Sequence, residues 1–140
     1  MNYQLTVTVR SQGLYDITHK VVEKVAEARI TQGLATIFIQ HTSASLLIQE
    51  NADPKVLRDL ENWMNRLVPE GDELYTHTQE GLDDMPAHIK SALTASSLSI
   101  PVVEGRLALG IWQGIMLWEH RHHRGVRDIV VSVIDAGLQA

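Results

Sequence analysis

The sequence contains no cysteine among its 140 residues. This absence excludes disulfide bonds, zinc sites built from thiolates and cysteine nucleophiles. Long apolar runs are also missing, since no stretch approaches the roughly 18 apolar residues that a membrane span needs. The first residues, 1–6, carry neither a basic segment nor an apolar run, so we expect no signal peptide. Together these absences favour a cytoplasmic protein that does not interact with a membrane.

Basic residues are fewer than acidic ones, with 12 lysines and arginines against 17 aspartates and glutamates. The formal net charge is −5, with an isoelectric point near 5.7. Non-specific binding to nucleic acid or to anionic lipid needs a large positive surface, so both are disfavoured, although a local basic pocket remains compatible with this balance. Nucleotide-binding loops of the Gly-x-Gly-x-x-Gly or Walker type are absent, as is the Gly-x-Ser-x-Gly elbow of hydrolases. These common catalytic frameworks are therefore set aside.

The chain length fits one domain, residues 1–140, with an ordinary balance of 44% hydrophobic and 21% charged residues. The period-two alternation of residues 3–10 predicts a half-buried strand. Residues 15–17 suggest a short strand, and 34–40 a well-buried one. Between them, Thr18 is a plausible helix N-cap, and Gly33 is a typical helix stop.

The second half of the chain contains clear helix and strand patterns on either side of a long segment without periodicity. Asp53 as N-cap and Pro54 at the first helical position predict a helix that ends before Pro69. Residues 70–85 show no periodicity and predict a loop, after which Pro86 opens a short helix. Strands are predicted over 97–103, 106–109, 115–119 and 128–134, with a hairpin turn at Glu104-Gly105. The predicted fold class is α+β, with mixed, largely antiparallel sheets.

Three of the seven histidines lie in polar, non-periodic surroundings: His41, His77 and His88. Neutral imidazole is the commonest metal ligand, and three histidines with an open fourth position form a catalytic type of zinc site. No pair of the three has a local motif spacing, so only the fold can bring them together. The alternative interpretation is that each is a solvated or hydrogen-bonded histidine.

Other charged and polar residues near these histidines suggest further roles. Glu80, Asp83 and Asp84 lie between His77 and His88, where a carboxylate can act as a general base or orient a ligand histidine. The alternative is a solvated acidic loop. Arginine binds phosphate through paired N–H donors, which suggests anion binding for Arg121 in the basic turn 120–125. The alternative interpretation is that this turn is an exposed hairpin tip whose charges only favour solubility.

Four blocks of sequence form a recognisable pattern: His41–Leu46, Glu50–Pro54, His77 with Glu80–Lys90, and Gly105–Leu107 with Gly110–Gly114. In this order, and over nearly the whole chain, they resemble the YjbQ-like family. Two departures are visible, since the family usually has threonine where this chain has Ile111 and asparagine where it has Gln49.

The resemblance implies a distorted β-sandwich with flanking helices that assembles as a homotrimer. It also implies a divalent-metal site, which transfers to His41, His77 and His88, with zinc as the expected ion and magnesium an option beside a diphosphate. The activity attached to the family is a secondary thiamine-phosphate synthase reaction, in which a pyrimidine diphosphate alkylates a thiazole phosphate and releases pyrophosphate. The expected partner is thus a small phosphorylated substrate.

That reaction needs charge stabilisation on the departing diphosphate. We therefore assign this stabilisation to the metal, Lys90 and Arg121, and we count Glu80 among the catalytic residues as a candidate general base. Two alternatives stay open: a metal-assisted hydrolase of a small phosphorylated or acyl metabolite, and a non-catalytic metal-binding or metabolite-binding trimer. The residues assigned to substrate binding are Asn51, Asp84, Trp112, Gln113 and His120.

Overall fold

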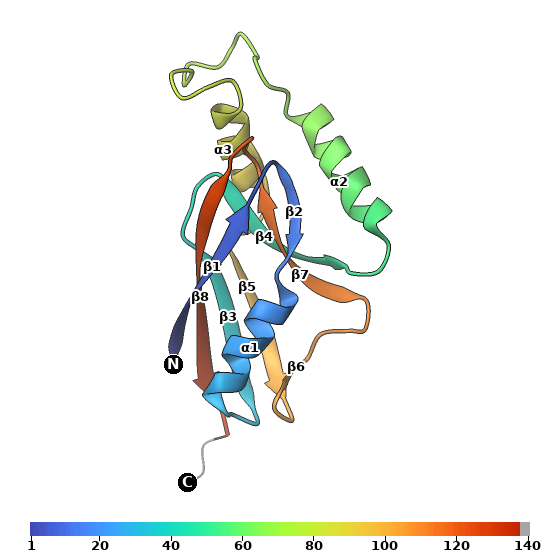
Figure 1. The fold of residues 1–140 in the computed structure, drawn as a ribbon, viewed down its shortest axis with the longest axis vertical. Helices are drawn as coiled ribbons and strands as arrows, with labels where there is room; N and C mark the ends of the chain where they lie inside the picture. Colours follow the sequence, from blue (N-terminus) through green and yellow to red (C-terminus); the bar gives the residue numbers. More distant parts are fainter. Residues whose placement is uncertain (138–140) are drawn as a thin grey trace.

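Within residues 1–137, eight strands form two antiparallel sheets that pack against each other (Figure 1). The computed structural model describes residues 1–137. The five-stranded sheet has the order β1-β8-β3-β5-β6, and the three-stranded sheet has the order β2-β7-β4. The strands are β1 (Asn2–Val9), β2 (Gly13–Asp16), β3 (Gly33–Ile39), β4 (Ala44–Glu50), β5 (Ser97–Val103), β6 (Arg106–Leu107), β7 (Gln113–Glu119) and β8 (Gly125–Asp135).

The core lies between the two sheets, and it follows from the alternation of side chains along each strand. In β1, Leu5, Val7 and Val9 are buried while the residues between them are exposed. They form one cluster with residues of the facing sheet such as Leu46 and Leu117. The α+β sandwich that the resemblance implied is thereby confirmed.

The helix α1 (Thr18–Ala28) buries Val21, Val25 and Ala28. Its ends differ from the prediction. Ile17 occupies the N-cap position without a side-chain cap, and the Thr18 hydroxyl accepts a hydrogen bond from the backbone of Ile115 at 2.8 Å instead. The left-handed residue that ends the helix is Arg29, with φ of 53°, whereas Gly33 begins β3.

The helix α2 (Pro54–Leu67) begins as predicted, because Asp53 Oδ1 accepts the Lys55 N–H at 2.9 Å. The helix α3 (Asp84–Leu93) begins two residues earlier than the predicted start at Pro86. β4 was not predicted at all. No helix in residues 1–137 combines the length and the apolar character needed to cross a membrane.

Three connections meet at one end of the sandwich (Figure 1). The turn between β7 and β8 covers residues 120–124, the connection between β3 and β4 covers 40–43, and the long connection between α2 and α3 covers 68–83. The α3 helix starts at this same end and packs against β4. The polar residues singled out in the sequence are mostly carried by these segments.

Candidate functional site

His77, Asp84 and His88 converge at the start of α3. His77 Nε2 lies 2.7 Å from Asp84 Oδ2, and His88 Nε2 lies 3.2 Å from the same oxygen. Their potential ligand atoms lie within 4.8 Å of one another. Asp84 and His88 share one face of α3 because they are four residues apart on a helix, and His77 arrives from the loop. We call these three residues the open cluster, since the side chains of both histidines are partly exposed while Asp84 is buried beneath them.

The electrostatics of the open cluster keep Asp84 ionised. Burial raises the pKa of the Asp84 carboxyl, but the hydrogen bond from His77 and the neighbouring positive charges outweigh burial and lower it. Those charges belong to His88 and to Arg121, whose Nη1 lies 3.4 Å from Asp84 Oδ1. The side chain of Glu80 lies near Asp84 and also contributes to the lowering of the Asp84 pKa. A carboxylate held in its charged form is a suitable metal ligand.

Arg121 fixes the loop that precedes α3. Its Nη2 donates to the Glu80 carbonyl at 2.7 Å and to Asp83 Oδ1 at 3.2 Å. The other oxygen of Asp83 accepts the backbone N–H of His122 at 2.8 Å. This hydrogen-bonded pairing raises the pKa of Arg121, and it lowers the pKa of Asp83 against the opposing effect of burial. The prediction that Arg121 binds phosphate needs correction, because its donors are directed at the protein itself.

His41 lies outside the open cluster. Its Nε2 accepts the Asp128 backbone N–H at 2.8 Å, and its Nδ1 lies 3.1 Å from Arg127 Nη1. Both ring nitrogens therefore already face donors, and burial beside Arg127 lowers the pKa of His41. Within the described chain the expected set of three histidines is not assembled, and Asp84 stands where the third histidine was predicted.

Lys90 and His120 belong to the protein interior. Lys90 is 1% exposed and donates to Asn65 Oδ1 on α2 at 2.5 Å. His120 is also 1% exposed, with its Nε2 2.8 Å from Ser45 Oγ. Burial, together with the charges of Lys90 and Arg127, lowers the pKa of His120 to about 3. As the chain is folded, neither side chain reaches a substrate, which corrects the predicted diphosphate-binding and substrate-binding roles.

The loop around Trp112 lies at the opposite end of β7 from Arg121. Seven residues of strand separate the two ends, which corresponds to roughly 20 Å. Asn51 Nδ2 donates to the Ile111 carbonyl at 3.2 Å, and Gln113 Oε1 accepts the Gly110 N–H at 2.7 Å. These contacts hold the loop, while Trp112 remains 61% exposed. Asn51, Trp112 and Gln113 therefore lie away from the open cluster within one chain, and their role in substrate binding stays a prediction.

The open cluster has the donor set of a divalent-metal site. Two imidazoles and one carboxylate are ligands for zinc, iron and related ions, with positions left for water or substrate. Ligands about 2.1 Å from a tetrahedral ion lie about 3.4 Å apart. The two nitrogen–oxygen distances of 2.7 and 3.2 Å are close to this spacing, so small side-chain movements accommodate an ion. The residues present fit a metal.

Comparison with known sequences agrees with this fold and length. A profile of the family described as UPF0047 protein YjbQ-like matches residues 3–136. The chain belongs to this family. UPF0047 protein sll1880 of Synechocystis is 50% identical over 129 residues, covering 92% of this chain and 88% of the relative. UPF0047 protein YjbQ of Escherichia coli O157:H7 is 44% identical over 130 residues, covering 92% and 94%.

Solved structures show the same YjbQ-like fold. The hypothetical protein APE1520 of Aeropyrum pernix K1 superposes with a TM-score of 0.87 at 27% identity, over 96% of this chain and 98% of that one. A YjbQ/UPF0047 protein of Clostridium acetobutylicum gives 0.83 at 36% identity, over 96% and 99%. None of these descriptions names an activity. The residues of the open cluster are therefore the basis for assigning a function to this member.

Asp84 is a ligand candidate for which the sequence predicts a different role, in substrate binding. Its place in the open cluster does not follow from the spacing of the histidines alone. The spacing Asp84-x-x-x-His88 on a predicted helix was the available signal, since residues four apart share a helix face. His77 has no such local signal, because it reaches the cluster only through the fold of the loop.

Proposed function

We propose that the chain is a divalent-metal-dependent enzyme of hydrolytic type, with His77, Asp84 and His88 as the metal ligands. The observation that carries the proposal is the convergence of both histidine Nε2 atoms on one buried carboxylate oxygen. Zinc is the ion we expect. When bound, such an ion lowers the pKa of a coordinated water and polarises a carbonyl or phosphoryl oxygen.

The surrounding residues have distinct tasks in this proposal. Asp84, kept ionised, supplies the charge that attracts a cation, and Arg121 pairs with its Oδ1 so that its Oδ2 faces the two histidines. Glu80 is exposed and lies beside Asp84, so its carboxylate is placed to accept a proton from an attacking water. The partial exposure of both histidines leaves one side of the cluster accessible to a substrate.

Hydrolysis is better supported than the transferase reaction that the family resemblance implied. The thiamine-phosphate synthase reaction needs cations on a departing diphosphate, and we had assigned Lys90 and Arg121 to that task. Lys90 is buried against Asn65, and Arg121 is paired with Asp83 and Asp84. A hydrolase needs an activated water and a base, which the open cluster and Glu80 supply.

We propose self-association as part of the same function, with a homotrimer as the expected state. The outer face of the five-stranded sheet exposes large apolar side chains from β3, β5 and β8 that nothing in the described chain covers. Exposed apolar faces of this kind often mark interfaces. The side chains are Leu34, Phe38, Val103 and Ile134, which are between 39% and 62% exposed.

The proposed function is tested by loading the purified protein with zinc and screening small esters, amides and phosphate esters. We expect about one equivalent of zinc by elemental analysis and hydrolysis that chelation abolishes. Glu80→Gln should keep the zinc and lose most of the rate, by about a hundredfold for a general base. Glu104→Gln, at the turn between β5 and β6, serves as the matched control. Absence of zinc binding in the wild-type protein would refute the proposal.

A further inference from the structure

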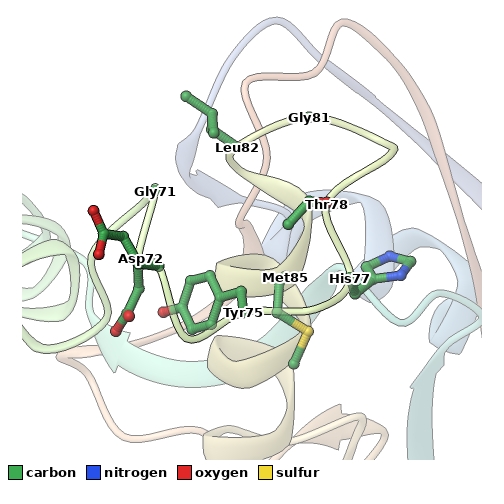
Figure 2. A pocket seen from close by; sticks show the side chains of 9 residues that line it. Gly71, Asp72, Tyr75, His77, Thr78, Gly81, Leu82 and Met85 are labelled. Carbon is green, nitrogen blue, oxygen red and sulfur yellow. The ribbon is translucent and has the colours of Figure 1, made fainter.

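A small cavity lies beside the open cluster, between the loop before α3 and the first turn of that helix (Figure 2). Its volume is about 200 Å³, and His77 of the open cluster forms part of its lining. Ligand pockets in proteins are usually about 300–1,000 Å³, so this cavity suits a small metabolite and is too small for a nucleotide.

The walls of the cavity are apolar at its middle. Figure 2 shows Tyr75 and Met85 between His77 on one side and Asp72 on the other. The Tyr75 hydroxyl donates to the Pro69 carbonyl at 3.0 Å, which holds the ring in place. A rigid aromatic ring facing a thioether side chain favours an uncharged stretch of ligand at this point.

The end of the cavity away from His77 carries the acidic side chain of Asp72 (Figure 2). Glu73, the next residue in the chain, also lines the cavity. Asp72 Oδ1 accepts the Leu74 N–H at 2.9 Å, which fixes this carboxylate at the start of a turn. Its other oxygen has no hydrogen-bond partner among residues 1–137. Burial and the charge of Asp72 together raise the pKa of Tyr75, as expected for a negative group beside the ring.

The lining contains no lysine or arginine, so these carboxylates are not neutralised within the cavity. Two basic residues of the turn between β7 and β8 are paired with other groups in the described structure. His122 Nε2 lies 2.8 Å from Glu70 Oε2, and Arg121 is directed at Asp83 and Asp84. A polyanionic ligand would therefore meet repulsion at the acidic end, whereas a cationic one would be attracted.

We propose that this cavity binds a small cationic substrate, with a metal-binding acyl group at His77, an uncharged body beside Tyr75 and Met85, and an ammonium group facing Asp72 and Glu73. This inference rests on the proposed metal site and narrows the acyl and phosphorylated classes considered for it to an amine-bearing acyl compound. The order of the three contacts along the cavity sets the order of groups along the ligand.

Three hydroxamic acids with the same metal-binding head and different tails test the inference by calorimetric titration of the zinc-loaded protein. The tails end in an ammonium (aminohexanohydroxamic acid), a methyl group (hexanohydroxamic acid) and a carboxylate (the monohydroxamate of adipic acid). We expect the ammonium probe to bind about tenfold more tightly than the carboxylate probe, as two partly exposed carboxylates can produce. Added salt should reduce this preference.

Substitutions test whether Asp72 and Glu73 cause the preference for the ammonium probe over the carboxylate probe. Asp72→Asn combined with Glu73→Gln keeps an acceptor for the Leu74 N–H and removes both charges, so the preference should fall to within about twofold. Glu104→Gln, at the far end of the molecule, should leave it unchanged.

The outcomes separate this inference from the proposed function. If zinc binds and the uncharged probe binds, but the charged probes do not differ, the inference is overturned and the metal site stands. Zinc binding without binding of any probe also overturns the inference alone. If zinc does not bind, both fail together.

Discussion

Two groups of charged residues lie at the same end of the sandwich. They differ in how deeply they are buried and in whether their contacts can be exchanged for a ligand. In the open cluster of His77, Asp84 and His88, two imidazole nitrogens face one carboxylate oxygen, and both histidines are partly exposed. In the group that we call the closed pair, Glu119 and Arg127, each partner is almost fully buried and bonded within the chain. The first arrangement can exchange its internal contacts for a ligand, whereas the second cannot do so without unfolding locally.

The closed pair joins several segments. Glu119 Oε1 and Oε2 accept Arg127 Nε and Nη2, both at 2.6 Å, and Oε2 also accepts the Arg121 backbone N–H at 3.0 Å. Arg127 Nη2 also donates to Ser43 Oγ at 2.9 Å. A bidentate contact between a guanidinium and a carboxylate makes strong hydrogen bonds. Removing only one of the two partners is costly, because it leaves the other charge buried and unpaired.

Breaking the closed pair is the largest effect that we predict. Glu119→Ala leaves the Arg127 guanidinium buried without its carboxylate, so the free energy of unfolding should fall by about 3–5 kcal/mol. Urea unfolding monitored by circular dichroism measures this change. Replacing both partners, with Glu119→Leu and Arg127→Met, should recover most of the loss because no charge is then stranded. A loss below about 1 kcal/mol in the single variant would show that the pair contributes little.

Breaking the open cluster should change metal binding and leave the fold intact. Asp84→Ala removes the oxygen on which both histidines converge, so zinc affinity should fall by at least about a hundredfold. His77→Ala and His88→Ala should behave similarly. His41→Ala is the discriminating control, because both nitrogens of His41 face other partners, and this variant should retain zinc. Loss of zinc in His41→Ala, measured by competition with a chelating dye, would restore the set of three histidines predicted from sequence.

The fold was predictable where local physics decides it. Asp53 and Pro54 mark the start of α2, and the pair Glu104-Gly105 adopts the positive φ angles of a tight hairpin turn. β4 was missed because its first three residues, 44–46, are all buried and include a serine, so no alternation is visible. A strand covered on both faces has no period-two pattern to read.

The sequence predicted which types of residue form the candidate site, but it predicted less well which individual residues belong to it. His77 and His88 were identified correctly as neighbours, but His41 is separated from them by the fold. Lys90 shows the limit most clearly, because a lysine two residues after His88 points to a different side of α3 and is buried. Charge alone predicts an exposed residue there, and only the packing of α2 reveals otherwise.

His120 offers a pH-dependent test of burial at this end of the molecule. Its pKa of about 3 lies below the ordinary value of 6.5, so between these values the unfolded state binds the extra proton. Stability should therefore fall as pH decreases from 6.5, by up to about 1.4 kcal/mol per pH unit from this one group. Unfolding of wild type and His120→Gln should be compared between pH 6.5 and 4.5, before most carboxylates titrate. Parallel curves for the two proteins would show that His120 is not buried in its neutral form.

The smallest effect concerns Arg121, which connects the two groups of residues because its backbone contacts Glu119 and its side chain contacts Asp84. Arg121→Lys keeps the charge but loses the planar set of donors that reaches Glu80, Asp83 and Asp84 at once. Asp84 should then be less well oriented, and zinc affinity should fall by about tenfold, as is typical when a residue behind a ligand is altered. Arg124→Lys in the same turn is the matched control, since Arg124 is exposed. Equal zinc affinities in both variants would mean that Asp84 is oriented by the two histidines alone, and that the link from Glu119 through Arg121 stabilises the loop without tuning the metal site.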